Sequence, residues 1–427
     1  MKTRIWLLLS VLAAGTTWLY VGKVLTPWNQ HRGEVIDRIK NQMGDLYSPW
    51  VGTRELLLHH RNPYSPEVSH EIQMVFYGHA VNQTYAQSAA TSAAPIINEQ
   101  RFAYPVYTVF LLAPTVYAEF ADVRAVTQLA FALLTAISVL LCLDILHWRL
   151  PWKTAAALIL FTLSSPQIVQ GLRFEQLAVV VGFLIVAGAW CVSKHHFTIA
   201  GILLALSTIK PQMALLPLCC FAIWTVGDWH KRWRLAASFL ITLTALIAAG
   251  ELLLPGWLGY FLVGIAAYRK YAPTSSLLSM ALGDTLGEIL GGIIILALLF
   301  VAWRNRKYAA DSEQFTATLA AFLIGAILAF PLFTPFNQVM LILPAMLLIK
   351  NWGNLPRISR VVFTVSVIWP WIVSLVLLLS PPRLDSPSQL PLLPSFVIVF
   401  FPFFLPLLLM TRRTPASRPQ ITDFRPS

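Results

Sequence analysis

The stretch Leu129–Leu143, LAFALLTAISVLLCL, contains no charged residue and decides the fold class. Similar apolar runs recur along the whole chain, among them residues 6–20, 177–192, 235–249 and 396–410. With modest extension, each run reaches the roughly 20 residues that a helix needs to cross a bilayer. The sequence therefore predicts an all-α protein, a polytopic transmembrane helical bundle.

The overall composition excludes a water-soluble fold of this size. Of the 427 residues, 57% are hydrophobic and 12% are charged, whereas a soluble domain carries roughly a quarter charged residues. The net charge of +12 is spread over short basic clusters between the apolar runs, as the positive-inside bias produces, and does not form a patch suited to nucleic acid. The four cysteines lie within apolar segments and predict no disulfide framework or metal site.

The apolar runs predict ten spans and two irregular segments. We expect the spans at about residues 4–22, 125–146, 154–171, 174–193, 234–253, 285–303, 314–331, 335–350, 357–379 and 390–411. Segment 104–118 is short and holds two prolines, and segment 197–226 is interrupted by Lys210-Pro211. The basic clusters all lie on the cytoplasmic side if segment 104–118 does not invert the chain and segment 197–226 is a hairpin of two short helices. We then expect a cavity beside these two segments. Ordinary short spans with misplaced basic loops are the alternative.

We expect one transmembrane domain over residues 1–411 and a disordered cytoplasmic tail at 412–427. This topology places a large polar loop, about 26–103, and a second loop, about 255–284, outside the cytoplasm. The first loop is predicted to begin with a surface helix over residues 29–43. The expected location is the inner membrane of a bacterial-type cell.

Two charged residues stand out as candidates for chemistry. Asp45 follows the outer end of the first span, and a carboxylate at the membrane boundary can have a raised pKa and act as a general base. Alternatively, Asp45 caps the helix that follows it. Lys210 lies in an apolar segment, where an ammonium group is costly and marks a functional candidate; it could instead snorkel to the surface.

Three further polar segments adjoin the apolar runs. Tyr104 opens segment 104–118 and suits either a site or an interfacial anchor. Arg173, Glu175 and Gln176 form a polar group between two expected spans, where they either contact a polar substrate or make a solvated turn with a local ion pair. Residues 337–338, Asn-Gln, lead into a span, which is also typical of a polar helix start.

The order and spacing of these segments resemble glycosyltransferase family 87, the membrane mannosyltransferase-like enzymes of the GT-C superfold. In that family the first outer loop carries an Asp followed by an aromatic residue, then a Gly and an Asn-Pro-Tyr sequence. These are matched by Asp45, Tyr47, Gly52 and Asn62-Pro63-Tyr64. Arg54 lies within the same segment.

The other motifs follow in the family's order. Tyr104-Pro105 is similar to a Tyr-Pro-Pro entry, with Val106 in place of the second proline, and residues 171–177 correspond loosely to a Gly-Gln-x-Asn-like turn. The Ala-Gly to Lys-Pro signature is matched over residues 200–211. Residues 336–344 resemble a Tyr-(Asp/Asn)-Gln run that ends in proline, with Phe336 replacing the tyrosine.

The resemblance implies a GT-C fold and inverting transfer of a monosaccharide from a polyprenyl-phosphate donor to a lipid or glycan acceptor on the extracytoplasmic face. In related enzymes the sugar is often mannose, the expected class here, and sometimes another hexose or a pentose. Asp45 would be the general base. Cationic side chains would stabilise the leaving phosphate without a metal or other cofactor, with Arg269 and Lys270 as leading candidates and Arg173 next. The lipid tail would leave beside segment 104–118.

The candidate substrate-binding residues are Tyr47, Arg54, Asn62, Tyr64, Tyr104, Arg173, Gln176, Lys210, Arg269, Lys270, Asn337 and Gln338. The expected partners are the donor, the acceptor and membrane lipids, and no nucleic acid. One competing interpretation is a lipid or sugar transporter or flippase that uses Lys210 and Glu251 as intramembrane charges. The absence of internal repeats disfavours it. A non-catalytic scaffold is a second alternative.

Overall fold

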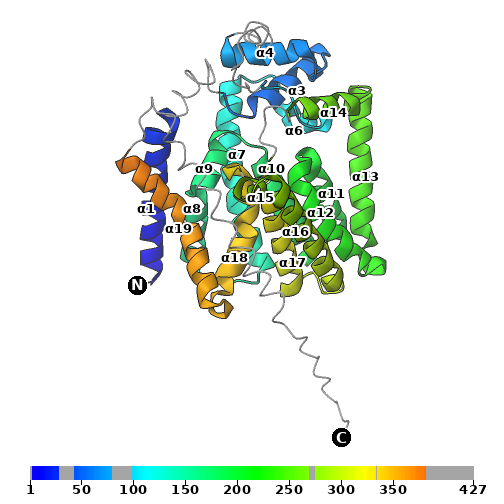
Figure 1. Cartoon of the computed structure of the whole chain (residues 1–427). Helices are drawn as coiled ribbons and strands as arrows, with labels where there is room; N and C mark the ends of the chain where they lie inside the picture. The colour runs from blue at the N-terminus through cyan, green and yellow to red at the C-terminus, as the bar shows by residue number, and fades with distance from the viewer. Residues whose placement is uncertain (1, 28–42, 79–98, 269–274, 333, 381–427) are drawn as a thin grey trace.

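The computed structural model describes residues 2–27, 43–78, 99–268, 275–332 and 334–380, and within them the chain is helical without a β-strand. Figure 1 shows a bundle of helices, with α3, α4 and α14 gathered across one end of it. The expected span at 390–411, the tail at 412–427 and most of the expected surface helix at 29–43 lie outside the described residues.

The chain forms long helices, short helices and tight helical turns in alternation. The α-helices are α1 (Lys2–Tyr20), α3 (Tyr47–His59), α4 (Pro66–Tyr77), α6 (Val109–Leu112), α7 (Phe120–Ile145), α8 (Trp152–Leu163), α9 (Pro166–Arg173), α10 (Ala178–Ser193), α11 (Phe197–Leu206), α12 (Pro211–Val226), α13 (Trp229–Leu253), α14 (Trp257–Tyr268), α15 (Leu277–Leu282), α16 (Asp284–Asn305), α17 (Glu313–Ala329), α18 (Ile342–Lys350) and α19 (Arg357–Leu379). The other helical turns are η1 (Val21–Leu25), η2 (Val106–Thr108), η3 (Ala113–Thr115), η4 (Ser207–Ile209), η5 (Pro335–Leu341) and η6 (Trp352–Asn354).

Five described helices are long and apolar enough to cross a membrane: Leu8–Leu25, Phe120–Ile145, Trp229–Leu253, Asp284–Asn305 and Arg357–Leu379. They match the expected spans near 4–22, 125–146, 234–253, 285–303 and 357–379. Large apolar side chains remain exposed on α13 and α16, as on helices that face lipid. The protein is therefore an all-α polytopic membrane protein.

The expected span at 154–171 contains two helices with a bend between them. α8 ends at Leu163, α9 begins at Pro166, and the two axes differ by 64°. Pro166 has no backbone N–H to continue the helix. Ser165 instead caps α9, because its hydroxyl accepts a hydrogen bond from the Ile168 N–H at 3.4 Å. The break bends the chain before it reaches the turn at 174–177.

The expected spans at 174–193, 314–331 and 335–350 correspond to shorter apolar helices. α10 and α17 have 16 and 17 residues, and α18 has 9 residues after the 3₁₀ turn η5. Nearly every side chain of α10 and α17 is buried. α10 packs against α7, α11 and η5, and α17 packs against α12, α16 and α18. These two helices form the centre of the bundle, where protein rather than lipid surrounds them.

Segment 197–226 forms two short helices that reverse direction. α11 ends at Leu206, η4 follows, and α12 starts at Pro211 after Lys210. Phe197 at the start of α11 and Trp224 near the end of α12 lie with ring centroids 6.0 Å apart, so the chain returns to the level at which it entered. This geometry fits the hairpin interpretation, with Lys210 at the tip.

Segment 104–118 is broken into η2, α6 and η3 and forms no helix long enough to span a membrane. The described part of the first expected outer loop forms α3 and α4, and the second expected outer loop contains α14 and α15. Tyr64, after α3, contacts Tyr260 and Phe261 of α14. The two expected loops therefore pack on each other at one end of the bundle (Figure 1).

We predict that Gly201→Ala destabilises the protein, because α11 packs directly on α13 at this glycine. A Cβ atom there would lie 2.0 Å from Ser238 Oγ and 2.4 Å from the Leu235 carbonyl oxygen, and overpacking of this kind costs about 1–3 kcal/mol. Thermal unfolding in detergent should show a lower midpoint. The matched control is Gly292→Ala, where no atom lies within 4 Å; an equal loss in the control would contradict the packing explanation.

Candidate functional site

A chain of hydrogen bonds joins four residues that are far apart in the sequence, and we call it the polar network. Lys210 Nζ donates to Gln176 Oε1 at 3.2 Å and to Asn337 Oδ1 at 3.0 Å. Gln176 Nε2 donates to a carboxylate oxygen of Asp45. Four of the five polar segments of the sequence therefore meet at one place.

Lys210 lies inside the bundle, with only 6% of its surface exposed. It therefore does not snorkel to the surface. A buried ammonium group is tolerated only where it is paired and hydrogen-bonded, and here it also lies 5.1 Å from the centre of the Phe336 ring. Asn337 Nδ2 donates to Thr334 Oγ1 at 2.6 Å, which leaves its amide oxygen to accept from Lys210.

Gln176 connects the cation to the anion. It lies in the turn between α9 and α10, where its backbone N–H donates to the Gly171 carbonyl oxygen at 2.9 Å. Its amide oxygen accepts from Lys210 while its amide nitrogen donates to Asp45. Only a side chain with both a donor and an acceptor can make this bridge.

Asp45, just before α3, bonds to the turn between α9 and α10. Its side chain does not cap α3, since Leu46 is the N-cap and makes no side-chain cap hydrogen bond. The Asp45 backbone N–H donates to the Phe174 carbonyl oxygen at 2.8 Å. The residue keeps an exposed face, but surrounding protein displaces water on its other sides. This desolvation raises the pKa of the Asp45 carboxyl to about 6, with Lys210 lowering it and Glu175 raising it further.

Two tyrosines lie near Asp45. Burial and the charge of Asp45 both raise the pKa of Tyr104 and of Tyr268, so the carboxylate is close enough to act on both phenols. The backbone of Tyr104 is fixed by Tyr64, whose hydroxyl donates a hydrogen bond to the Tyr104 carbonyl oxygen at 2.6 Å. Tyr268 is the last residue of α14, so part of the second expected outer loop lies near the polar network.

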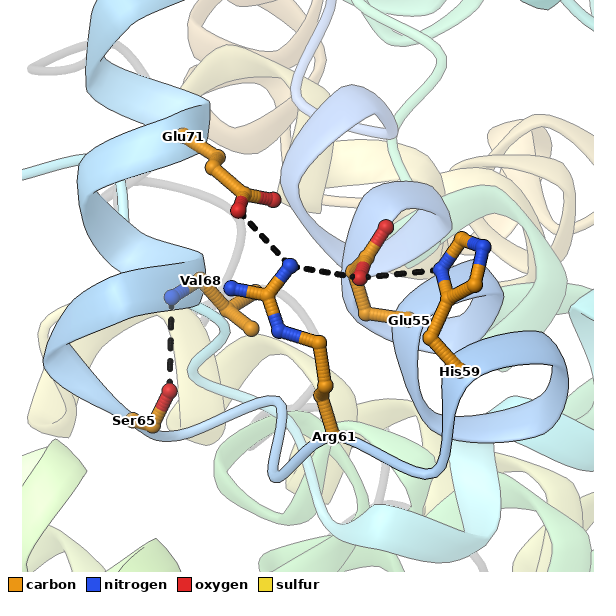
Figure 2. Close-up of polar contacts among 6 residues, drawn as sticks. All are labelled: Glu55, His59, Arg61, Ser65, Val68 and Glu71. Carbon is orange, nitrogen blue, oxygen red and sulfur yellow. Dashed lines mark hydrogen bonds and ion pairs between the residues drawn. The ribbon is translucent and has the colours of Figure 1, made fainter.

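The corner between α3 and α4 is fixed by an ion cluster, which Figure 2 shows. The Arg61 guanidinium lies between Glu55, at 2.9 Å, and Glu71, at 2.7 Å, and His59 Nδ1 lies 3.1 Å from Glu55. Asn62 Oδ1 accepts from the Tyr64 N–H at 2.9 Å. Asn62 thus shapes the turn that aims Tyr64 at Tyr104.

The other predicted site residues lie apart from the network. Tyr47 packs edge-on against Phe76 and Phe120, and Arg54 is exposed with its guanidinium 5.5 Å from the Trp50 ring centre. The Arg173 guanidinium contacts the Thr26 hydroxyl and, at 3.4 Å, the Val21 carbonyl oxygen, tying α9 to the end of the first helix. Arg269 and Lys270 lie outside the described residues.

An apolar groove lies between α8, α18 and α19, and one member of the predicted site lines it. Its lining includes Leu158, Phe161, Ala345, Val367, Trp371 and Gln338. Gln338 is the neighbour of Asn337 in the chain, so the groove adjoins the polar network. The cavity predicted beside segments 104–118 and 197–226 remains a prediction.

Residues that the sequence did not single out also support the site. Arg124 and Gln128, both near the start of α7, bind the Glu175 carboxylate at 2.9 and 2.6 Å. Their spacing of four residues places them on one face of the helix, and that spacing of two polar side chains in an apolar span could have indicated a buried partner.

The sequence model of glycosyltransferase family 87 matches residues 102–335, more than half of the chain. The chain belongs to glycosyltransferase family 87. No curated protein and no solved structure matches it. The family 87 match contains Tyr104, Gln176 and Lys210, and the hydrogen bonds of the polar network connect it to Asp45 and Asn337 on either side. The protein is therefore a membrane glycosyltransferase.

We predict that Asp45→Asn lowers glycosyl transfer by about 10²- to 10⁴-fold, because it removes the carboxylate that we expect to act as the general base while keeping the side-chain shape. The rate of transfer of radiolabelled sugar to a membrane lipid extract measures the loss. Asp122→Asn, an exposed carboxylate at the start of α7, is the matched control and should retain full activity. Normal turnover by Asp45→Asn would remove Asp45 from this role.

The pKa of Asp45 also predicts the acid limb of the pH–rate profile. A base must be deprotonated, so activity should fall as the pH drops through about 6. The limb should be absent from the residual activity of Asp45→Asn. A limb that persists unchanged in that variant would belong to another group.

Proposed function

We propose that this protein transfers a monosaccharide, mannose-like, from a polyprenyl-phosphate donor to a lipid or glycan acceptor on the extracytoplasmic face of a bacterial-type inner membrane, with inversion. One observation carries the proposal: an accessible carboxylate, Asp45, and a buried ammonium, Lys210, stand at opposite ends of one hydrogen-bonded bridge. Inverting transfer from a phosphate carrier needs a base on the acceptor side and a cation on the leaving-group side.

The proposed reaction is a single displacement. The acceptor hydroxyl oxygen bonds to the anomeric carbon, and its proton passes to Asp45. The bond between the anomeric carbon and the phosphate oxygen breaks, and polyprenyl phosphate leaves with the electron pair. Lys210 neutralises the charge that develops on this phosphate, while Asn337 holds the ammonium in place. Arg269 and Lys270 remain proposed as further phosphate ligands.

Protein cations carry the leaving-group charge in this proposal, so it calls for no metal or other cofactor. The acceptor reaches Asp45 from its exposed side, among the segments that gather at the α3, α4 and α14 end of the bundle (Figure 1). We propose that this end faces away from the cytoplasm and that residues 1–411 form one catalytic domain.

The polyprenyl chain needs an apolar place beside the phosphate. The groove between α8, α18 and α19 has mostly apolar walls, and its lining includes Gln338, the residue after Asn337. We therefore assign the first isoprene units to this groove, in preference to the opening expected beside segment 104–118.

We predict that Ala345→Trp, which fills the groove, raises KM for long-chain donors about tenfold, the loss expected for roughly two displaced methylenes. KM for a short-chain water-soluble analogue should not change. Ala156→Trp on α8, outside the groove lining, is the control. A short-chain donor affected as strongly as a long one would mean a distorted site, and no effect on either would favour the opening beside segment 104–118.

The competing transporter interpretation requires intramembrane charges at Lys210 and Glu251. Glu251 is exposed, and its carboxylate accepts a hydrogen bond from the Gly256 N–H at 2.7 Å. It thus stabilises the turn between α13 and α14. Glu251 therefore has a local structural role, and it is not among the residues that bond to Lys210 in the described part of the chain.

The direct test offers purified protein a panel of radiolabelled polyprenyl-phosphate sugars together with membrane lipid acceptors. Turnover of one donor by the wild type, lost in Asp45→Asn, would support the donor class, the sugar and the base together. Folded wild-type protein that turns over nucleotide sugars and no lipid-linked donor would contradict the proposal.

We predict that Lys210→Met lowers kcat/KM for the donor by about 10²- to 10³-fold, comparable to removing one oxyanion-stabilising group. The acid limb should also move to higher pH, because Lys210 lowers the pKa of Asp45. Lys231→Met is the control, since that ammonium is 80% exposed. An acid limb that stays at the wild-type position would contradict the coupling between the two charges.

A further inference from the structure

Glu175 combines two unfavourable features beside the site. Its side chain is fully buried, and its backbone φ of 48° lies in the left-handed region, which a residue other than glycine adopts only at an energetic cost. Burial of a carboxylate adds a desolvation cost. Such features persist only where the surrounding structure enforces them.

The enforcing contacts come from α7. Arg124 Nε and Gln128 Nε2 both donate to Glu175 Oε1, at 2.9 and 2.6 Å, and Arg124 also reaches the Arg173 carbonyl oxygen at 3.4 Å. These bonds attach the turn at 173–176 to α7. The same turn supplies both described contacts to Asp45, from the Phe174 carbonyl oxygen and the Gln176 side chain.

The second carboxylate oxygen of Glu175 faces the Asp45 loop. A Cβ atom at Gly44 would lie 1.5 Å from Glu175 Oε2 and 2.7 Å from its carboxyl carbon, so only glycine fits between the loop and this carboxylate. Oε2 is buried and accepts no hydrogen bond from the residues that the structure describes. Arg124 and Gln128 bind Glu175 through Oε1, so the unbonded oxygen Oε2 is the part of the carboxylate that acts on Asp45, the residue after Gly44.

We infer that Glu175 is a positioning residue for the proposed transfer: anchored by Arg124 and Gln128, it holds the turn to which Asp45 bonds and presents a fixed negative charge to the Asp45 loop. The inference rests on the proposed function for its kinetic consequences only. Within the described part of the chain, the titratable groups that interact with Asp45 are Glu175, Lys210, Tyr104 and Tyr268.

Two variants separate position from charge. Glu175→Gln keeps an oxygen that can accept from Arg124 and Gln128 but removes the charge. Glu175→Asn tolerates the left-handed backbone but is one methylene too short to keep both contacts. Glu119→Gln, which removes an exposed carboxylate at the N-terminus of α7, is the control and should match the wild type.

Kinetics give the first readout. Glu175→Asn should lower kcat about 10- to 100-fold, as for a reacting group displaced by about 1 Å, with little change in the donor KM. Glu175→Gln should recover most of this kcat, and its acid limb should lie at lower pH than in the wild type, opposite to Lys210→Met. Removal of a negative neighbour lowers the pKa of a carboxyl, which fixes this sign.

A second readout needs no turnover. Dicyclohexylcarbodiimide modifies protonated carboxyls, so the pH dependence of Asp45 modification, followed by peptide mass spectrometry, reports its titration. The midpoint should fall in Glu175→Gln and stay unchanged in Glu119→Gln. A shifted midpoint in protein that transfers no lipid-linked sugar would support the inference and contradict the proposed function. An unshifted midpoint in folded Glu175→Gln, or full kcat in Glu175→Asn, would overturn the inference.

Discussion

The ammonium group of Lys210 is a positive charge in the interior of an apolar bundle, and the packing around it has to supply its hydrogen-bond partners. The side chains of Gln176 and Asn337 are neutral. Their amide oxygens accept hydrogen bonds from the ammonium without neutralising its charge. The nearest compensating carboxylate, Asp45, is reached through Gln176 rather than by direct contact. This separation keeps an ammonium and a carboxylate in one site without a direct ion pair between them.

Interrupted helices bring these side chains together. The turn between α9 and α10, the tip between α11 and α12, and the 3₁₀ turn before α18 each place one polar residue of the network. A helix end exposes backbone groups that lipid cannot satisfy, so such ends are tolerated at membrane depth only where protein encloses them. The buried helices α10 and α17 supply that enclosure. The shorter apolar helices and the turns between them are therefore the elements that build the site.

Much of the fold was predictable from the sequence because long apolar runs such as Leu129–Leu143 have a single stable outcome in a bilayer. The break in the expected span at 154–171 was less visible, since Ser164-Ser165-Pro166 interrupts neither the apolar composition nor the length. Asp45, Gln176, Lys210 and Asn337 were all among the candidates, but their contacts depend on tertiary packing across as many as 131 residues. Tyr47 and Asn62 also matched family motifs, and Arg173 lies in a loosely matching turn, but none of the three bonds to the polar network among the residues that the structure describes. Local sequence does not distinguish a side chain that belongs to the network from one that packs beside it.

The hairpin with Lys210 at its tip also affects how the protein is made. Asn337 follows Lys210 by 127 residues, and ribosomes add roughly 5–20 residues per second. For on the order of ten seconds the nascent chain therefore carries a lysine whose full set of partners has not yet been synthesised. Until η5 has been synthesised, the Lys210 ammonium needs water or a chaperone to supply its missing hydrogen bonds. Completion of the polar network is therefore a late step in biogenesis. A chain truncated before η5 would keep a charge that lacks a partner, which cellular quality control could detect.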